Sequence, residues 1–487
     1  MKKRTGKISG IIIAIIYMFA FAAIGAYSAS FAESYLGEEE TTAKSMIIVL
    51  IYVIMAYIGA MIHIAVHEAG HLIFGKLTGY EFKSYRIFNL MWQKDKDEKV
   101  RFYKYSLAGT GGQCMMGPPE MKDDDMQDMP FVLYNLGGII MNLVVSLIFF
   151  GFFLLQKETI FFKGFCIVML IIGISYVLVN GIPLPASTND GSNTLSIARS
   201  KKARKAFWVQ MKGVILLTEG TRIKDFPKEW FSMPDEKGLQ NTMEAVMAVY
   251  VCDRLMDEHR FKEAKKTMAQ LLNANTAINE IHRKMLKTNA LYCELLRMKE
   301  EIKNRNEENK ETEENLKDIE IKNKRVTEDK TLNKKTSQEN ERNNNEKNNC
   351  ERNNNERSIN DKRINERNIN ETNNQETNSK EINNIETDKK ETDNKEIENK
   401  EPKLKENNTI EEIKENIRKY LDKDLEQFWK AMKKNPSVIR TQYAYEKIYE
   451  QNEEKAGKCL DEFEKAAKVY PYPVEIEAER EFLYFAL

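Results

Sequence analysis

Two histidines and a glutamate stand close together in the segment His67-Glu68-Ala69-Gly70-His71. Residues four apart lie on one face of an α-helix, so both imidazoles can reach a single metal ion. Glu68 is rotated by about 100° from His67, so its carboxylate can approach a water molecule at that ion without binding the ion. Imidazole ligands suit zinc, and a catalytic zinc site keeps one position open for water. The pattern predicts a hydrolytic zinc centre in which Glu68 removes a proton from water.

The alternative is that these histidines only pack inside a helix. The chain has five histidines in all, and two of them stand at ligand spacing with a glutamate between them. They also lie in an apolar segment, where ionisable side chains are costly and usually functional. His63 lies on the same face, but about 12 Å along the axis from His71, too far to share one ion. We interpret His63 as a polar lining residue.

A third metal ligand is expected from residues 180–191. Pro183 and Pro185 stop a helix in this segment. Irregular backbone at membrane depth is tolerated only where it lines a cavity or packs on protein. Asp190 follows, and its Asp-Gly sequence is also a common turn signal. Because the helices that carry both motifs are expected to end on one side of the membrane, we predict that Asp190 completes the ligand set.

Apolar stretches of the length needed to cross a bilayer, about 20 residues, must position these groups. Four are predicted, at residues 8–29, 46–74, 129–155 and 161–181. The third is expected to start at Asp128 as N-cap, with Pro130 just inside. A fifth apolar run, residues 206–217, is too short and carries a lysine, and we interpret it as a soluble or interfacial helix.

The distribution of charge orients these helices. Basic residues precede the first helix and follow the second and the fourth, whereas the loop after the first carries glutamates. The positive-inside rule therefore places the N-terminus, the loop 76–128 and everything after residue 182 in the cytoplasm. The predicted location is the cell membrane, with several spans. For the first segment, a signal peptide cleaved near Ser30-Phe31-Ala32 is the alternative.

These motifs together resemble the site-2 protease family of intramembrane zinc metalloproteases. That family carries H-E-x-x-H on one transmembrane helix and an Asp-Gly motif on a later one, often after Asn-x-x-Pro-x-Pro. The resemblance covers about residues 45–195. It implies zinc as cofactor and the following roles: metal ligands His67, His71 and Asp190, general base Glu68, and Asn180 as the residue that steadies the substrate carbonyl.

One departure from the family pattern concerns the asparagine. The stretch from Pro185 to Asp190 is longer than the usual spacing, so Asn189 stays an alternative to Asn180. Gly137-Gly138 with Asn142 is similar to a Gly-and-Asn pattern that the family carries on the intervening helix. Small residues at helix contacts are common in membranes in any case.

Residues 80–119 separate the second and third apolar stretches. Phe82–Trp92 and Val100–Tyr105 are rich in aromatic and β-branched residues, and the charged turn Lys94–Lys99 lies between them, which predicts a β-hairpin. A Gly-rich loop, Leu107–Pro119, follows. A protease needs an extended substrate, so we expect the hairpin edge to receive it by strand addition. A purely structural hairpin is the alternative.

The C-terminal part combines helical segments with a low-complexity tract. Residues 239–300, within a predicted helical domain part 201–302, and residues 409–487 show helical periodicity that resembles tetratricopeptide hairpins, with an ordinary helical bundle as the alternative. Residues 303–408 consist mainly of Asn, Glu, Lys, Thr and Ile, and are predicted to be a disordered insertion. The six cysteines form no CxxC pair, which fits a reducing cytosolic setting.

The predicted fold is therefore mainly α: a transmembrane zinc-protease domain (residues 1–200) with a β-hairpin insertion, and a cytoplasmic helical domain interrupted by a disordered tract. The expected partners are a membrane-anchored protein substrate, the lipid bilayer and a cytoplasmic protein. The net charge is zero, and no nucleic-acid partner is expected. A non-catalytic scaffold is an alternative, disfavoured by the intact Glu68. A metal transporter is a second alternative. It is disfavoured because the sequence does not repeat candidate metal ligands along several helices.

Overall fold

The computed structural model describes residues 2–37, 41–95, 97–105, 110–121, 126–155, 160–184, 189–355 and 409–487. The chain divides into two compact units. The larger comprises Met1–Leu296 with Asn416–Leu487, and the smaller comprises Arg297–Glu415. The larger unit is therefore built from two stretches of chain that the smaller unit separates in sequence.

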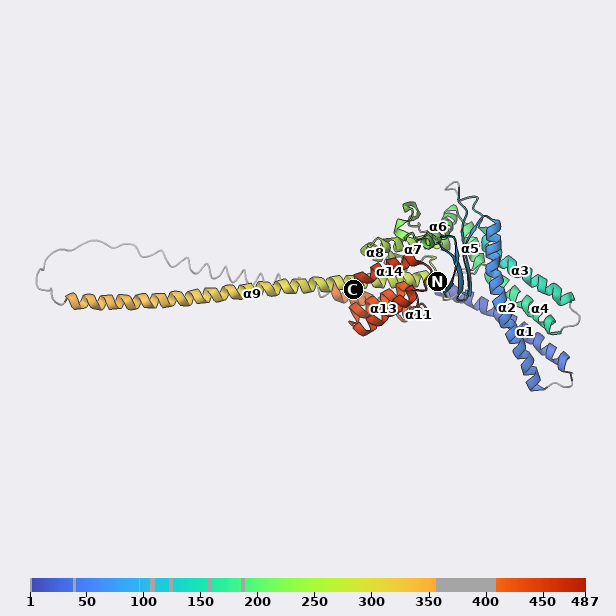
Figure 1. Cartoon of the computed structure of the whole chain (residues 1–487), viewed down its shortest axis with the longest axis horizontal. Helices are drawn as coiled ribbons and strands as arrows, with labels where there is room; N and C mark the ends of the chain where they lie inside the picture. The colour runs from blue at the N-terminus through green and yellow to red at the C-terminus, as the bar shows by residue number, and fades with distance from the viewer. Residues whose placement is uncertain are drawn as a thin grey trace. The chain divides into compact units, whose positions relative to one another are not determined.

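Four long apolar helices begin the larger unit (Figure 1). They are α1 (Lys2–Leu36), α2 (Thr42–Leu77), α3 (Val132–Leu155) and α4 (Ile160–Gly181). Each contains a segment long and apolar enough to cross a bilayer, so the four candidate spanning helices that the sequence predicts are present. Asp128 is not an N-cap, because α3 starts only at Val132. Pro130 disfavours helical backbone in the residue before it, which moves the start of the helix beyond the proline.

Helices α2 and α3 meet backbone to backbone at two glycines. A Cβ atom on Gly70 would lie 2.3 Å from the carbonyl oxygen of Gly137, and one on Gly137 would lie 2.6 Å from the carbonyl oxygen of Gly70. Only glycine permits this approach, which is typical of close helix pairs in membranes. Gly70 lies between His67 and His71 in sequence, so the contact presses the histidine-bearing turn against α3.

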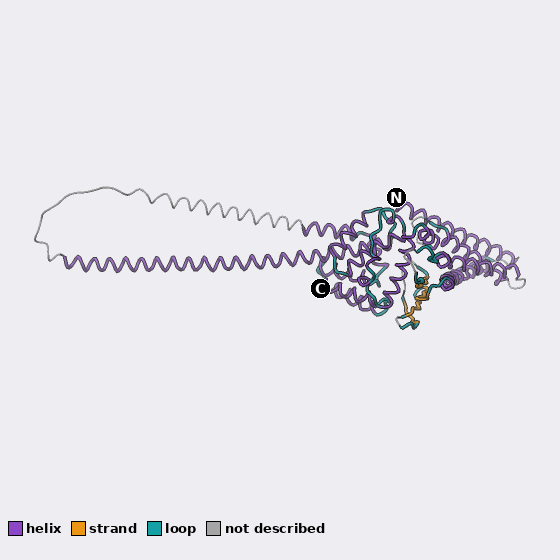
Figure 2. The backbone as a smooth tube through the Cα atoms, turned by 90° about the horizontal axis from the view of Figure 1, so that it is seen from above, coloured by secondary structure: helices purple, strands orange, loops and turns teal. Residues whose placement is uncertain are grey.

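The segment between α2 and α3 forms one antiparallel sheet (Figure 2). Its strands are β1 (Glu81–Ile87), β2 (Leu90–Lys94), β3 (Val100–Lys104) and β4 (Gly112–Gly117), in the order β3-β2-β1-β4. The predicted two-stranded hairpin is therefore wrong in its extent, although the turn between β2 and β3 lies where it was expected. Phe88 has φ 53° and ends β1, and Ile87 then pairs with Leu90 across the turn. The predicted Gly-rich loop contains strand β4, while Leu107–Gly109 lie outside the described residues.

The remaining helices of the larger unit follow α4. They are α5 (Asp190–Ala198), α6 (Lys201–Glu219), α7 (Thr242–Asp257), α8 (Phe261–Asn273), the start of α9 (Glu280–Asn355), α11 (Lys423–Ala431), α12 (Pro436–Ala444), α13 (Glu453–Ala467) and α14 (Pro473–Ala486). Short 3₁₀ helices are η2 (Ile223–Asp225), η3 (Lys228–Trp230) and η4 (Gly238–Gln240), and η5 (Tyr445–Tyr449) is a π-helix. The run 206–217 lies in α6, which is not among the candidate spans. The tetratricopeptide resemblance stays a prediction.

The two stretches of the larger unit are joined by buried polar contacts. Tyr292 Oη donates to the carbonyl oxygen of Phe482 at 2.5 Å, and Arg440 Nη2 donates to Asn289 Oδ1 at 2.6 Å. A further contact ties the C-terminal helices to the sheet, because Gln93 Nε2 on β2 donates to the carbonyl oxygen of Pro471 at 3.0 Å. The residues after the insertion therefore complete a fold that begins before it.

Helix α9 contradicts part of the predicted disorder. It runs from Glu280 to Asn355 and so includes the first half of the tract 303–408. The stretch 303–355 contains no Gly or Pro and is rich in Glu, Lys and Arg, which have high helix propensity. Lys303 and Glu307 add an ion pair one turn apart, at 3.7 Å. A solvent-exposed helix needs no buried core, so the shortage of apolar residues does not exclude it. Residues 356–408 lie outside the described residues.

Candidate metal centre

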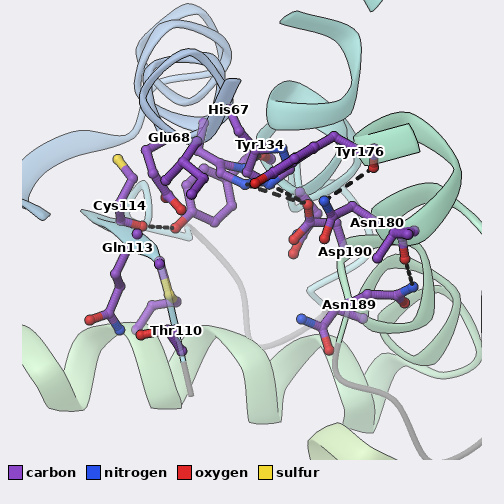
Figure 3. Close-up of a pocket in the computed structure, with 18 of the residues that line it drawn as sticks. His67, Glu68, Thr110, Gln113, Cys114, Tyr134, Tyr176, Asn180, Asn189 and Asp190 are labelled. Atoms are coloured by element: carbon purple, nitrogen blue, oxygen red, sulfur yellow. Dashed lines mark hydrogen bonds and ion pairs between the residues drawn. The ribbon is translucent and has the colours of Figure 1, made fainter. Parts of the chain in front are cut away.

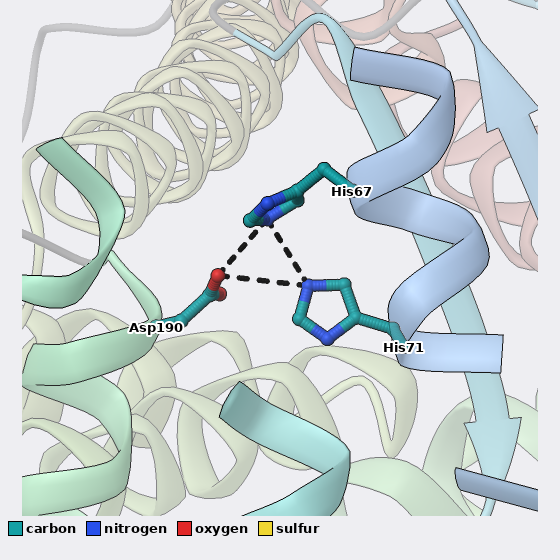
Figure 4. A group of neighbouring side chains, drawn as sticks. All are labelled: His67, His71 and Asp190. Atoms are coloured by element: carbon teal, nitrogen blue, oxygen red, sulfur yellow. Dashed lines mark hydrogen bonds and ion pairs between the residues drawn. The ribbon is translucent and has the colours of Figure 1, made fainter. Parts of the chain in front are cut away.

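The two histidines of α2 and the first residue of α5 converge on one point (Figure 4). Asp190 Oδ2 lies 3.0 Å from His67 Nε2 and 3.6 Å from His71 Nε2, and the two nitrogens are 3.2 Å apart. Tetrahedral zinc with bonds of about 2.0–2.1 Å would separate its ligand atoms by about 3.3 Å. The three atoms are thus spaced as metal ligands are.

Asp190 is held in place by the junction between α4 and α5. The side chain of Asn189 caps α5 by accepting from Ser192 N at 3.0 Å, and its Nδ2 donates to the carbonyl oxygens of Val179 and Ile182. Gly191 makes room for this junction, because a Cβ there would lie 2.1 Å from the carbonyl oxygen of Gly181. The Asp-Gly sequence therefore lets α5 start directly against the end of α4. Pro185 lies outside the described residues.

The far side of each imidazole is held by α3. His71 Nδ1 lies 2.8 Å from the backbone carbonyl oxygen of Tyr134. A carbonyl only accepts, so Nδ1 carries the hydrogen and the lone pair of Nε2 points at the cluster. His67 Nδ1 lies 3.1 Å from the side-chain amide of Asn142. This asparagine belongs to the Gly-and-Asn pattern noted in the sequence.

His63 extends the same network away from the cluster. Its Nδ1 lies 3.1 Å from the Asn142 amide and its Nε2 lies 2.9 Å from the carbonyl oxygen of Met169, so Nε2 carries the hydrogen. An amide has a donating and an accepting end. In the structure the amide oxygen of Asn142 faces His63 Nδ1 and the amide nitrogen faces His67 Nδ1. Exchanging the two ends of the amide, which have nearly the same shape, lets His63 Nδ1 accept and places the hydrogen of His67 on Nδ1. His63 is fully buried and does not line the cavity described below, so its interpretation as a lining residue is wrong.

The cluster therefore brings three electron-pair donors together. With the amide exchanged in this way, the lone pairs of the two Nε2 atoms face Asp190 Oδ2, a buried atom with no hydrogen-bonding partner among the described residues. Three such atoms repel one another unless a cation lies between them. The donor set of two imidazoles and one carboxylate is one that zinc uses in catalytic sites. These residues fit a divalent metal.

Comparison with known protein families agrees with this chemistry. A model of peptidase family M50 matches residues 55–445 of the chain. The chain belongs to peptidase family M50, the site-2 protease family. Neither curated proteins nor solved structures gave a match. Membership makes this M50 peptidase a membrane metalloprotease, and its four apolar helices fit that class.

A cavity of about 630 Å³ adjoins the cluster of this M50 peptidase (Figure 3). Glu68 lies on the side of β4, where a Cβ on Gly112 would be 2.5 Å from its Cγ. Asn180 and Asn189 lie on the side of Asp190. Asn180 Nδ2 donates one hydrogen to the carbonyl oxygen of Tyr176 at 3.1 Å. The structure thus brings all the predicted site residues to one cavity or its metal cluster.

Arg86 supports the site of this M50 peptidase from outside the cavity, and it was not predicted from the sequence. It is only 1% exposed, and its guanidinium donates to the carbonyl oxygens of Phe88 at 2.7 Å and Gly112 at 3.2 Å, and to Thr110 Oγ1. These bonds fix the start of β4 where the strand lines the cavity. In the sequence Arg86 was one of several basic loop residues that served only to orient the helices, and no motif marked it.

Proposed function

We propose that this M50 peptidase is a zinc endopeptidase that cuts membrane-anchored proteins, with the metal held by His67, His71 and Asp190. The observation that carries the proposal is the convergence of two Nε2 atoms and a buried carboxylate oxygen beside Glu68 and a cavity. When bound, zinc would act as a Lewis acid on water and on the scissile carbonyl group. A scaffold without catalysis would have no need of Glu68.

The protein groups divide the remaining work. Glu68 accepts a proton from the attacking water and delivers it to the leaving amine nitrogen. Asn180 has a second hydrogen on Nδ2 beyond the one given to Tyr176, and this hydrogen serves the substrate carbonyl oxygen. The amide of Asn189 is already used by backbone groups of α4 and α5, so Asn180 suits the role better. Water attacks directly, without an acyl-enzyme.

Metal removal tests this proposal. The full chain, purified in detergent and reconstituted with a membrane-anchored reporter, is expected to carry roughly one zinc per chain. A zinc chelator should abolish cleavage, and added zinc should restore it. Metal content is measured by atomic emission, and cleavage by electrophoresis of the reporter. Cleavage by a protein that contains no metal would contradict the proposal.

We infer the orientation from the basic residues that flank the helices. With the N-terminus and the loop 76–128 in the cytoplasm, the helices after α4 face the cytoplasm as well. There they would recruit a protein partner through the surface of their helical hairpins. Cleavage would then occur near the cytoplasmic face of the cell membrane.

We infer that the substrate docks on the outer edge of β4. This strand lies at the edge of the sheet and lines the cavity with residues 112–114. The carbonyl oxygen of Cys114 accepts from Tyr134 Oη at 3.0 Å and so points away from β1. In an antiparallel pair both backbone groups of a residue point to the same side, so the N–H of Cys114 also faces the free edge. An unwound substrate segment can satisfy such groups.

A proline at position 114 should therefore weaken proteolysis. Cys114→Pro removes the outward N–H, and we expect cleavage of the reporter to fall about tenfold, because one backbone hydrogen bond to the substrate is lost. Zinc content should stay unchanged. Cys114→Ala removes the thiol but keeps the N–H, and is the matched control. Equal cleavage by the proline and alanine variants would reject docking at this edge.

Deletion of residues 303–408 should leave zinc content and cleavage largely unchanged. The side chains of residues 306–325 are exposed and add nothing to a core. Within the smaller unit, Arg297 Nη1 lies 3.3 Å from Glu412 Oε1, so a short Gly-Ser linker can rejoin the chain. Metal analysis and the reporter assay check the result. Loss of both properties would show that the tract is part of the catalytic fold.

A further inference from the structure

A second cavity, of about 360 Å³, lies among the C-terminal helices of the larger unit. It shares no lining residue with the cavity at the metal cluster. Its wall comes from α6, residues 222–226, α7 and the start of α9 on one side of the insertion, and from α12, residues 470–472 and α14 on the other. Proteolysis as proposed above makes no use of it.

The polar wall of this cavity carries an excess of carboxyl groups. Six residues with carboxyl or guanidinium groups line it: Asp253, Asp257, Glu475, Glu479, Arg222 and Arg440. Arg222 Nε lies 3.0 Å from Asp257 Oδ1, and Arg440 Nε lies 3.3 Å from Glu479 Oε2. In each pair the guanidinium offsets the charge of its carboxylate. The other two carboxyl groups, on Asp253 and Glu475, form no ion pair with a described residue.

These two carboxyl groups differ in their hydrogen bonds. Glu475 accepts from Tyr470 Oη at 2.7 Å, whereas Asp253 forms no hydrogen bond or ion pair with a described residue, although the positive charge of Arg440 acts to lower its pKa. Burial, with neighbouring carboxylates adding to it, raises the pKa of both groups to about 7. A positive charge placed between them would favour their ionised forms.

Arg440 supplies an unmatched donor to the same wall. Its side chain is 0% exposed and its guanidinium lies 4.1 Å from the centre of the Tyr292 ring. Nη2 is bound to Asn289, but Nη1 has no hydrogen-bonding partner among the described residues. Buried donors are almost always satisfied, so an oxygen atom of a ligand is the partner that fits here.

The rest of the wall is largely apolar and aromatic, with Phe226, Tyr250, Val474 and Phe482. We propose that this cavity binds a molecule with a primary ammonium group, an oxygen acceptor close to it and an apolar side chain. That is the chemistry of an apolar amino acid or of the N-terminal residue of a peptide. The ammonium group meets Asp253 and Glu475, the oxygen meets Arg440 Nη1, and the side chain packs on the aromatic wall.

Calorimetric titration of the purified full chain tests this binding site. The probes are L-phenylalanine, L-phenylalaninamide and N-acetyl-L-phenylalanine, at millimolar concentrations. We expect the first or the second to bind, and the acetylated compound, which has no ammonium group, to bind about tenfold more weakly or not at all. Tighter binding of the free amino acid identifies an amino acid as the source. Tighter binding of the amide identifies a peptide N-terminus.

Variants of the two unpaired carboxyl groups sharpen the test. Asp253→Asn and Glu475→Gln should each weaken binding about tenfold, because each removes one charge partner of the ammonium group. Glu477→Gln on the exposed face of α14 is the matched control and should bind as the unmodified chain does. Thermal unfolding checks that each variant folds, and two variants are used so that one misfolded protein does not decide the matter. Absence of binding by every probe, equal binding of the acetylated compound, or unchanged affinity in a folded carboxyl variant would overturn the proposal. The binding readout does not require proteolysis, so it stands apart from the test of the protease.

Discussion

Glu68→Gln is expected to lower the rate of substrate cleavage by about 10²–10⁴-fold, because it removes the group that accepts and returns the proton. Glutamine keeps the size and the polarity of the side chain, so its contact with Gly112 and the shape of the cavity should be preserved. The initial rate of reporter cleavage in proteoliposomes measures the effect. The zinc content of the variant should equal that of the unmodified protein, since Glu68 is not among the three converging ligand atoms.

The control for this variant is Glu120→Gln, which changes a glutamate outside the metal cavity and should cleave normally. Two results would argue against the role of Glu68. One is cleavage within a few-fold of the normal rate, which would assign the proton transfer to another group. The other is loss of zinc together with activity, which would make Glu68 part of the metal site.

Asp190→Ala should remove zinc from the protein. It deletes the carboxylate that faces both imidazoles at 3.0 and 3.6 Å and leaves only two protein ligands. Loss of a group one shell further out typically costs 10–100-fold in metal affinity, so we expect a loss beyond about 100-fold and no measurable cleavage. Metal analysis after dialysis against a weak chelator measures the first effect, and the reporter assay the second.

Asn193→Ala is the matched control, because Asn193 lies one turn later on α5 and lines the same cavity without belonging to the cluster. It should retain zinc. If Asp190→Ala retained the metal and cleaved normally, the third ligand would have to be sought elsewhere, and the proposed site would fail. Asp190→Asn should lower zinc affinity less than Asp190→Ala does, since an amide oxygen is still a ligand but a weaker one than a carboxylate.

The parts of the site that depend on local rules could be predicted from the sequence. Helix geometry alone brings His67 and His71 to one face. The apolar helices could be predicted from the length and apolar character of their sequences. The proximity of Asp190 was predicted only because both motifs were expected on one side of the membrane. The structure adds the reason for the Asp-Gly sequence, which is the contact between Gly191 and the backbone of Gly181.

Features that depend on long-range contacts could not be predicted. Strand β4 follows glycines that suggest a loop, and only its pairing with β1 makes it a strand. Phe88 has a positive φ that a phenylalanine rarely adopts, so nothing in the sequence marked the turn. Arg86 and His63 act through backbone oxygens and an amide that are distant in sequence. The prediction of disorder for residues 303–355 was wrong for the opposite reason. Their low-complexity composition was given more weight than the high helix propensity of their residues.

The hydrogen bond from Gln93 to Pro471 has a consequence for how the protein is made. Its partners are 378 residues apart in the chain. At a translation speed of about 5–20 residues per second, the ribosome needs roughly 20–75 s to travel from one to the other. During that interval the sheet beside the metal site has been synthesised, whereas the segment around Pro471 that contacts it has not. We therefore expect the nascent chain to become an active protease only late in its synthesis, well after its first helices have entered the bilayer.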